Sequence, residues 1–385
     1  MSRNQKIFLW FVVISCIVSF LSTFTLYHFP GERTIILVLS YVLGLSNIGR
    51  MMEKQYVSLA FMFVILSLVA MILPLINGTM PDFKSMTGIT FGFFFILLKN
   101  NYKLFVLDKC IYIISTLLLL SLIEFFIISY WGWGIKLGVV QRGETAFFFN
   151  HYLFNMIKLG GVRFQSLCAE PSTVGGICGF MLFILNGIEQ YRKTFFIFLI
   201  AGLTSLSLTF YVFLAIFLLW NSSHFNIKTL SYIAIGLFFA FFMFGDNIKQ
   251  FIVERYQSGE YDDRASEAFM NKYDDFLHSS DVWFGKGEGA VKDIDDGGVT
   301  VGFRREVYEV GIVGIFLIFI AFSYPLFKMS KIDKFILLYF AVFWISYYST
   351  SNVYHSLKIM MFFSVPAFAL YRKQELLKEK YSNKK

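Results

Sequence analysis

The stretch from Thr194 to Trp220 reads TFFIFLIAGLTSLSLTFYVFLAIFLLW, and its interpretation decides the fold. It is too long for one ordinary membrane-spanning helix and short for two, because about 20 apolar residues cross the hydrocarbon core of a bilayer. A polar cluster from Thr204 to Thr209 interrupts its middle, where a turn would fit. The stretch therefore predicts either one long span or a hairpin of two short helices.

The composition of the whole chain indicates that this stretch belongs to a membrane protein. Of the 385 residues, 57% are apolar, 20% are aromatic and only 16% are charged. A water-soluble chain carries roughly a quarter charged residues, so an ordinary soluble enzyme and a disordered chain are both excluded. The net charge of +8 is in this setting a topology signal, and we expect no nucleic-acid partner.

Apolar runs on both sides of the stretch predict further membrane-spanning helices. They are Ile7–Leu26, Thr34–Ile48, Val57–Ile76, Thr87–Leu98, Cys110–Trp131, Thr173–Ile188, Leu230–Gly245, Val307–Ser323, Phe335–Tyr348 and Leu357–Leu370. If the stretch is a hairpin, the short cytoplasmic loops and tails hold 19 Lys and Arg residues and the short outer loops hold three. If it is one span, the basic C-terminal tail falls outside. The positive-inside rule favours the hairpin, hence an all-α fold of about 12 transmembrane helices with both termini cytoplasmic.

This topology divides the chain into six parts. Helices 1–5 occupy residues 1–131, a first large outer loop 132–172, helices 6–9 residues 173–245, a second large outer loop 246–305, helices 10–12 residues 306–370, and a basic tail 371–385. The second loop holds 13 acidic residues, half of the chain's total. Polar segments of this kind fold outside the membrane and often carry the function. The four cysteines have no metal-site spacing and are expected to be free thiols.

Each outer loop is predicted to contain a helix. In Phe147–Lys158, polar and apolar residues separate to opposite faces at 100° per residue, which predicts an interfacial helix lying flat on the bilayer. In Arg264–Leu277, the apolar spacing is also helical, and Asp263 suits the N-cap position.

In the first loop, the candidate site runs from Arg163 to Ser172, at the entrance to a span. Pro171 and Ser172 suit the start of a helix. Arg163 and Glu170 would lie at the membrane surface, where a charge is costly unless it is paired or used. One interpretation is an anchoring arginine with a capping glutamate. The other is a site for an anionic lipid-linked group, because an arginine fork and a helix N-terminus both suit phosphate oxygens.

In the second loop, three features are candidates. The glycine loop Phe284–Gly289, with Lys286, Gly287 and Glu288, is either a backbone nest for a diphosphate or a plain turn. Arg304 and Arg305, followed by Glu309, break the positive-inside trend and suggest substrate binding as readily as plain solvation. His278 is either a general base or a surface histidine. The acidic turn from Asp293 to Asp296 is too weak a pattern for a metal site, so no metal is expected.

Taken in order, these features resemble the O-antigen polymerases of Gram-negative bacteria, part of a superfamily of O-antigen polymerases and ligases. The resemblance covers about residues 100–370 and departs from the Arg-x10-Gly pattern of such polymerases, since Arg163 and Gly175 are separated by eleven residues. It is carried by the two large outer loops and by four short motifs: Arg163…Glu170-Pro171-Ser172, Ser205-Leu206-Ser207, Phe284–Gly289 and Arg304…Glu309-x-Gly311-Ile312-Val313-Gly314.

The resemblance implies a glycosyltransferase of the bacterial inner membrane, active at the periplasmic face, that joins undecaprenyl-diphosphate-linked oligosaccharide repeat units into lipopolysaccharide O-antigen. It implies no cofactor and no metal. Its implied partners are inner-membrane lipid, a chain-length regulator and a flippase. The implied diphosphate clamp is Arg163, Arg264 and Arg304 or Arg305, while Glu170, His278 or Glu309 orients or deprotonates the acceptor hydroxyl.

Two other functions remain as alternatives. A flippase or transporter would place charges inside its spans, and here Glu124 is the clearest such residue. The ligases resemble one another in a motif of the form His-(Asn/Ser/Gln)-x9-Gly-x-x-Gly. This chain has Gly311 and Gly314, but Thr300 stands where that motif has histidine. The sequence therefore favours a polymerase.

Overall fold

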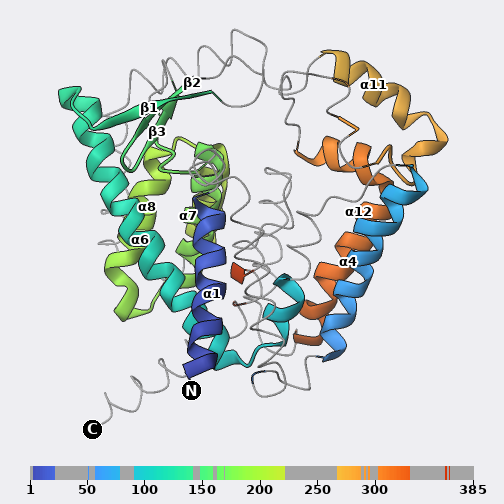
Figure 1. Cartoon of the computed structure of the whole chain (residues 1–385), viewed down its shortest axis with the longest axis horizontal. Helices are drawn as coiled ribbons and strands as arrows, with labels where there is room; N and C mark the ends of the chain where they lie inside the picture. Colours follow the sequence, from blue (N-terminus) through green and yellow to red (C-terminus); the bar gives the residue numbers. More distant parts are fainter. Residues whose placement is uncertain are drawn as a thin grey trace. The chain divides into compact units, whose positions relative to one another are not determined.

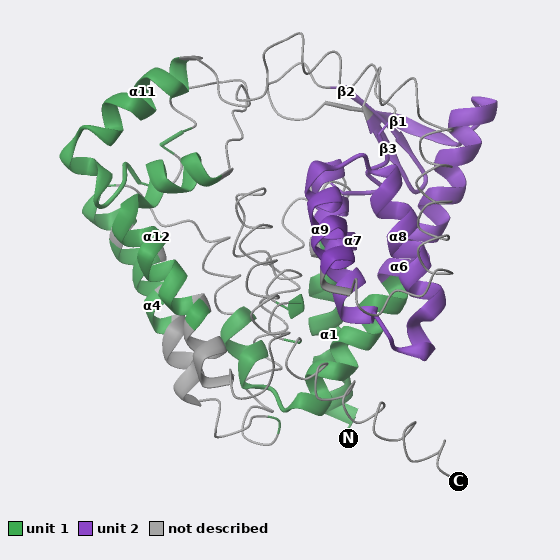
Figure 2. Ribbon diagram, turned by 180° about the vertical axis from the view of Figure 1, so that it is seen from behind, with its two compact units in different colours: residues 1–113, 268–295, 300–385 green, residues 114–267, 296–299 purple. Residues whose placement is uncertain are grey.

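The computed structural model describes residues 3–21, 51, 57–78, 91–141, 148–158, 163–168, 170–221, 267–287, 290, 291, 294, 302–329, 360, 361 and 364. Most of these residues are helical. The chain forms two compact units (Figure 2). Unit 1 comprises residues 1–113, 268–295 and 300–385, and unit 2 comprises residues 114–267 and 296–299.

One helix among the described residues is long and apolar enough to cross a membrane. It is α6, Asn100–Trp131, which begins ten residues before the apolar run predicted there and ends with it. Helix α4, Val57–Ile76, has the bounds of a predicted run, and α1, Arg3–Phe20, overlaps another. The runs Thr34–Ile48, Leu230–Gly245 and Phe335–Tyr348 lie outside the described residues. The count of about 12 spans therefore stays a prediction.

In unit 1, α4 packs along α12, Gly302–Met329 (Figure 1). Helix α11, Glu267–Leu277, precedes the short η4, Ser280–Val282, which also contacts α12. The apolar face of α11 buries Phe269, Tyr273 and Phe276, spaced three and four residues apart as one helical face requires. The rings of Phe269 and Phe276 lie 5.5 and 4.8 Å from that of Tyr308 on α12. The helix predicted over Arg264–Leu277 is thus confirmed for its described part, Glu267–Leu277.

In unit 2, the decisive stretch is a hairpin of two helices. Helix α8, Arg192–Thr204, follows the short η2, Glu189–Tyr191, and α9 runs over Leu208–Asn221. Both pack on α7, Pro171–Leu185. Phe195 lies near the start of α8 and Phe217 near the end of α9. Their rings are 6.0 Å apart, so the two helices are antiparallel. The predicted turn at the polar cluster is confirmed, while the side of the membrane on which it lies stays a prediction.

Glycines on α7 let α9 approach closely. A Cβ atom on Gly179 would lie 2.3 Å from the ring of Phe213, and one on Gly175 would lie 2.4 Å from Cβ of Ser207. Small residues spaced four apart commonly form such contacts between membrane helices, because they bring the two backbones together. The hairpin therefore rests on a glycine stripe of α7.

A three-stranded antiparallel sheet follows α6. Its strands are β1, Lys136–Gln141, β2, Phe148–Tyr152, and β3, Met156–Lys158, with β2 in the centre. The interfacial helix predicted over Phe147–Lys158 is therefore wrong. Phe149 and His151 are buried at 7% and 1% exposure, whereas Phe148 is exposed, so burial alternates with a period of two. The segment is apolar enough to fit both periods, and its pairing with β1 decides for the strand.

Candidate functional site

In unit 2, Arg163 holds the turn of the helix hairpin. Its Nε donates to the carbonyl of Ser205 at 3.3 Å, and its Nη2 donates to the carbonyl of Leu206 at 3.0 Å. The amide of Phe164 donates to the carbonyl of Thr204 at 3.3 Å. Leu206 has a φ of 49°, in the left-handed region that non-glycine residues seldom occupy. The first two motifs of the resemblance therefore lie in contact, although Arg163 and Ser205 are 42 positions apart in sequence.

Glu170 stands at the N-cap position of α7, but its side chain makes no capping bond to a backbone N–H. Its carboxylate instead accepts a hydrogen bond from Oγ of Ser172 at 2.9 Å. Pro171 occupies the first turn, as predicted. The capping interpretation of Glu170 is thus wrong, while the position of its negative charge at a helix N-terminus is favourable.

A second polar network ties the sheet to α6. The carboxylate of Glu124 accepts hydrogen bonds from the amides of Leu153 and Phe154, at 3.0 and 2.8 Å, and from Nδ2 of Asn155 at 3.0 Å. Oγ of Ser121 donates to the carbonyl of Phe154 at 2.8 Å and lies 2.7 Å from Oγ of Ser166. Glu124, the clearest charge inside a predicted span, therefore holds the turn between β2 and β3.

In unit 1, the glycine loop fills a break in α12. The helix departs from helical geometry at Gly311, where φ is 70° and ψ is 177°. The amides of Lys286 and Gly287 donate to the carbonyls of Tyr308 and Glu309, at 2.8 and 3.0 Å. Beyond the break, the amide of Val313 donates to the carbonyl of Trp283 at 3.0 Å. We call Trp283–Gly287 together with Tyr308–Val313 the helix-break cluster. Its loop supplies hydrogen bonds that a broken helix otherwise lacks.

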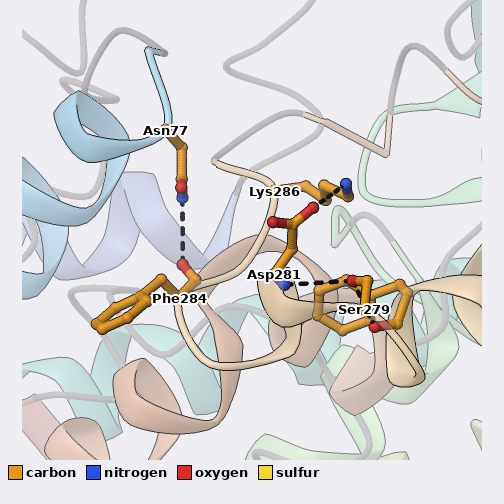
Figure 3. A network of polar contacts seen from close by, with 6 residues as sticks. Asn77, Ser279, Asp281, Phe284 and Lys286 are labelled. Carbon is orange, nitrogen blue, oxygen red and sulfur yellow. Dashed lines mark hydrogen bonds and ion pairs between the residues drawn. The ribbon is translucent and has the colours of Figure 1, made fainter.

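Of the two interpretations of the glycine loop, the described amides favour the plain turn over the diphosphate nest: those of Lys286 and Gly287 are bonded to α12, and that of Gly285 donates to the carbonyl of Asp281 at 2.7 Å. The Lys286 ammonium pairs with the Asp281 carboxylate (Figure 3). Nδ2 of Asn77, just after α4, donates to the carbonyl of Phe284 at 3.1 Å in the same network. Over Phe284–Gly287 the loop is a structural turn, which agrees with the second interpretation. Glu288 lies outside the described residues.

The remaining candidate side chains of unit 1 lie beside this cluster in sequence. Nε of Arg305 donates to Oε1 of Glu309 at 3.1 Å, with the Glu309 side chain 7% exposed and that of Arg305 29% exposed. Nη1 of Arg304 lies 3.2 Å from Sδ of Met270 on α11. Arg264, a candidate that belongs to unit 2, lies outside the described residues.

His278, at the end of α11, is exposed, and its Nδ1 lies 2.8 Å from the carbonyl oxygen of Asp274. A carbonyl only accepts hydrogen bonds, so Nδ1 carries the proton. The neutral ring then presents Nε2 as the nitrogen with a free lone pair. A general base needs such a nitrogen.

Two residues of the helix-break cluster and its surroundings were missed by sequence reasoning. Asn77 contacts a residue 207 positions away, and Asp281 gives no motif of its own. No local sequence signal points to either of them. The structure thus groups the described candidates around two features, the hairpin turn of unit 2 and the helix break of unit 1.

Comparisons with family models, with curated proteins and with solved structures give no match for this chain.

Proposed function

We propose that this chain is an O-antigen polymerase, a polytopic enzyme of about 12 transmembrane helices in the bacterial inner membrane. Both termini lie in the cytoplasm and the active face is periplasmic. The substrates are oligosaccharide repeat units linked to undecaprenyl diphosphate. The protein works beside a flippase that delivers them and a regulator that sets chain length.

One observation supports this proposal most: the four motifs of the resemblance contact one another in pairs. Arg163 binds the carbonyls of Ser205 and Leu206 in unit 2. The glycine loop binds the carbonyls just before Gly311 in unit 1. The pairing indicates that each motif is part of a local structure with its own geometric requirement.

The proposed reaction moves a growing chain onto a new unit. The bond between the anomeric carbon of the donor chain and its diphosphate oxygen breaks, and undecaprenyl diphosphate leaves with the bonding electrons. A hydroxyl oxygen at the non-reducing end of the acceptor unit forms the new glycosidic bond, and its proton passes to a base. Because the diphosphate is already a good leaving group, the protein chiefly aligns the reactants and stabilises developing charge.

Arginines carry the anion-binding role in this proposal. The backbone amides of Lys286 and Gly287 are engaged by α12, so this proposal gives them no part in binding the diphosphate. Arg304 and Arg305 precede the helix break, and their guanidinium groups suit phosphate oxygens. The resemblance also implies an anion-binding role for Arg163 and for Arg264. His278 is the best-supported base because its Nε2 is the unprotonated nitrogen, with Glu309 and Glu170 as the other candidates.

The test is deletion of the gene in the source bacterium, followed by gel analysis of the surface glycan. Loss of the ladder with retention of a single repeat unit is the expected result, and a plasmid copy should restore the ladder. Loss of every repeat unit would instead indicate a flippase or a ligase and would overturn the proposal. A plasmid copy carrying His278→Ala tests the base, while His278→Gln keeps a comparable volume without a basic nitrogen.

A further inference from the structure

An exposed apolar surface continues from the end of α6 onto the sheet of unit 2. Six apolar residues in this short segment are each more than half exposed. We call them the α6–β1 surface: Tyr130, Trp131, Trp133, Ile135, Leu137 and Val139. The backbone of β1 is paired with that of β2. The exposed side chains therefore belong to a strand that already has a partner.

Helix α6 is long and apolar enough to bring this surface to a membrane. At 1.5 Å per residue its 32 residues extend about 48 Å, longer than the roughly 30 Å of hydrocarbon. Leu119, Ile123 and Tyr130 are exposed on one helical face, and Leu118 and Phe125 are buried on the opposite face. The helix thus presents an apolar stripe to its surroundings, and that stripe ends at the α6–β1 surface.

The chain then folds back onto the helix. Gly132, with a φ of 63°, ends α6 in the left-handed conformation that glycine adopts without strain. A Cβ atom on Gly134 would lie 2.7 Å from Cγ1 of Ile128 and 3.0 Å from the ring of Tyr152. Gly134 is therefore packed between Ile128 in the last turns of α6 and Tyr152 of strand β2.

The two faces of the sheet differ in burial. Phe149 and His151 on one face of β2 are buried, and Met156, which pairs with His151, is buried with them. On the other face, Phe148 and Val139 are exposed, beside the half-buried Asn150 that pairs with Val139. A sheet face that meets water is normally polar. Between Trp131 and Gln141 the only charged residue is Lys136, so no acidic group repels an anionic headgroup.

We propose that the α6–β1 surface lies in the interfacial layer of the bilayer and binds lipid there. Tryptophans and tyrosines favour this layer because their rings are apolar with one polar edge. The amide of Met156 donates to the carbonyl of Ser166 at 2.9 Å, which ties the sheet to the segment carrying Arg163. Insertion of the sheet therefore keeps Arg163 near the headgroups, where the diphosphate of a lipid-linked substrate lies. The inference rests on the membrane location proposed above.

Lipid-depth quenching tests the proposal. The full chain, with its four native cysteines replaced by serine or alanine, carries one new cysteine with an environment-sensitive fluorophore, at Leu137, at Ile123 in α6, or at the polar exposed Asn271 of α11. Each protein is reconstituted into vesicles of phosphatidylethanolamine and phosphatidylglycerol with quenchers near the headgroup or deep in the acyl chains. We expect position 137 to be quenched most by the headgroup-level quencher, position 123 by the deep one, and position 271 by neither.

Each other outcome contradicts a different statement. If position 137 behaves like position 271 while position 123 is quenched, the sheet does not bind lipid and the membrane location stands. If position 123 is not quenched either, the membrane location fails together with this inference. If emission from position 137 is shielded from water but insensitive to both quenchers, and energy transfer between labelled copies rises with protein density, the surface binds a second copy instead.

Discussion

Arg163 donates hydrogen bonds to two carbonyls of a tight turn, so we expect its replacement to affect folding as well as the proposed substrate binding. Hydrogen bonds from a charged group contribute about 1.5–3 kcal/mol each. We expect Arg163→Ala to lower the melting temperature of the purified protein and to abolish the glycan ladder. Arg163→Lys should recover little of either, because an ammonium group lacks the two-pronged geometry of a guanidinium.

Two measurements separate the roles of Arg163. A melting temperature equal to that of the wild type, together with a lost ladder, would assign Arg163 to the substrate alone. A normal ladder from Arg163→Ala would remove it from the site. Lys193→Ala is a suitable control, since Lys193 is an exposed basic residue on the same helix hairpin.

Cys168 provides a probe of folding at the same scale. All four cysteines are buried free thiols, and burial raises the pKa of the Cys168 thiol. The thiolate is the reactive form, and a free cysteine has a pKa of about 8.5, so a raised pKa keeps Cys168 protonated and unreactive at neutral pH and in mild base. We expect maleimide to modify none of the four in the native protein and all four after denaturation. Rapid modification of the native wild-type protein would contradict the burial.

At the scale of the element, the helix break depends on two glycines. A Cβ atom on Gly285 would lie 2.3 Å from the carbonyl oxygen of Glu309, and one on Gly311 would lie 2.5 Å from the amide nitrogen of Gly285. Both glycines also have positive φ, which costs other residues about 1–2 kcal/mol.

We therefore expect Gly285→Ala and Gly311→Ala each to lower the melting temperature and to reduce polymer formation. Gly138→Ala is the matched control, because a Cβ atom there meets nothing within 4 Å. If all three variants melt together, the loop and α12 do not pack as the structure shows.

The helix hairpin makes a prediction about topology. Leu206 is 6% exposed and Leu208 is 66% exposed, so position 208 is the accessible place for a label near the turn. In a protein without native cysteines, we expect a membrane-impermeant maleimide to reach a cysteine at 208 from the periplasm. A cysteine at 376 should react only after the membrane is opened. Labelling of 376 but not 208 from outside would favour an 11-span topology.

At the scale of the whole molecule, the product distinguishes a polymerase from a ligase. Thr300 stands where the ligase motif has histidine, and a threonine hydroxyl does not accept a proton near neutral pH. Purified protein given lipid-linked repeat units should form longer lipid-linked chains, with or without lipid A core. Core-linked single units, formed without longer lipid-linked chains, would show a ligase instead.

The sequence alone determined the helices whose apolar pattern is unambiguous. Helix α4 has the predicted bounds, and the hairpin turn lies at the predicted polar cluster, because long apolar runs and polar interruptions are properties of neighbouring residues. It also marked Arg163, Glu170, Arg305 and Glu309 as charges at the ends of apolar runs. Their contacts followed only from the folded chain.

Tertiary structure decided whatever depends on partners distant in sequence. Phe147–Lys158 fits a helical and an extended period, and only the ladder with β1 makes it a pair of strands. The glycine loop has free amides as an isolated segment, but α12 breaks at Gly311 and uses them. Glu124 is an isolated charge in an apolar run until the turn after β2 donates to it. In each case a hydrogen-bonding group takes the partner that the fold brings to it, and local sequence does not encode that partner.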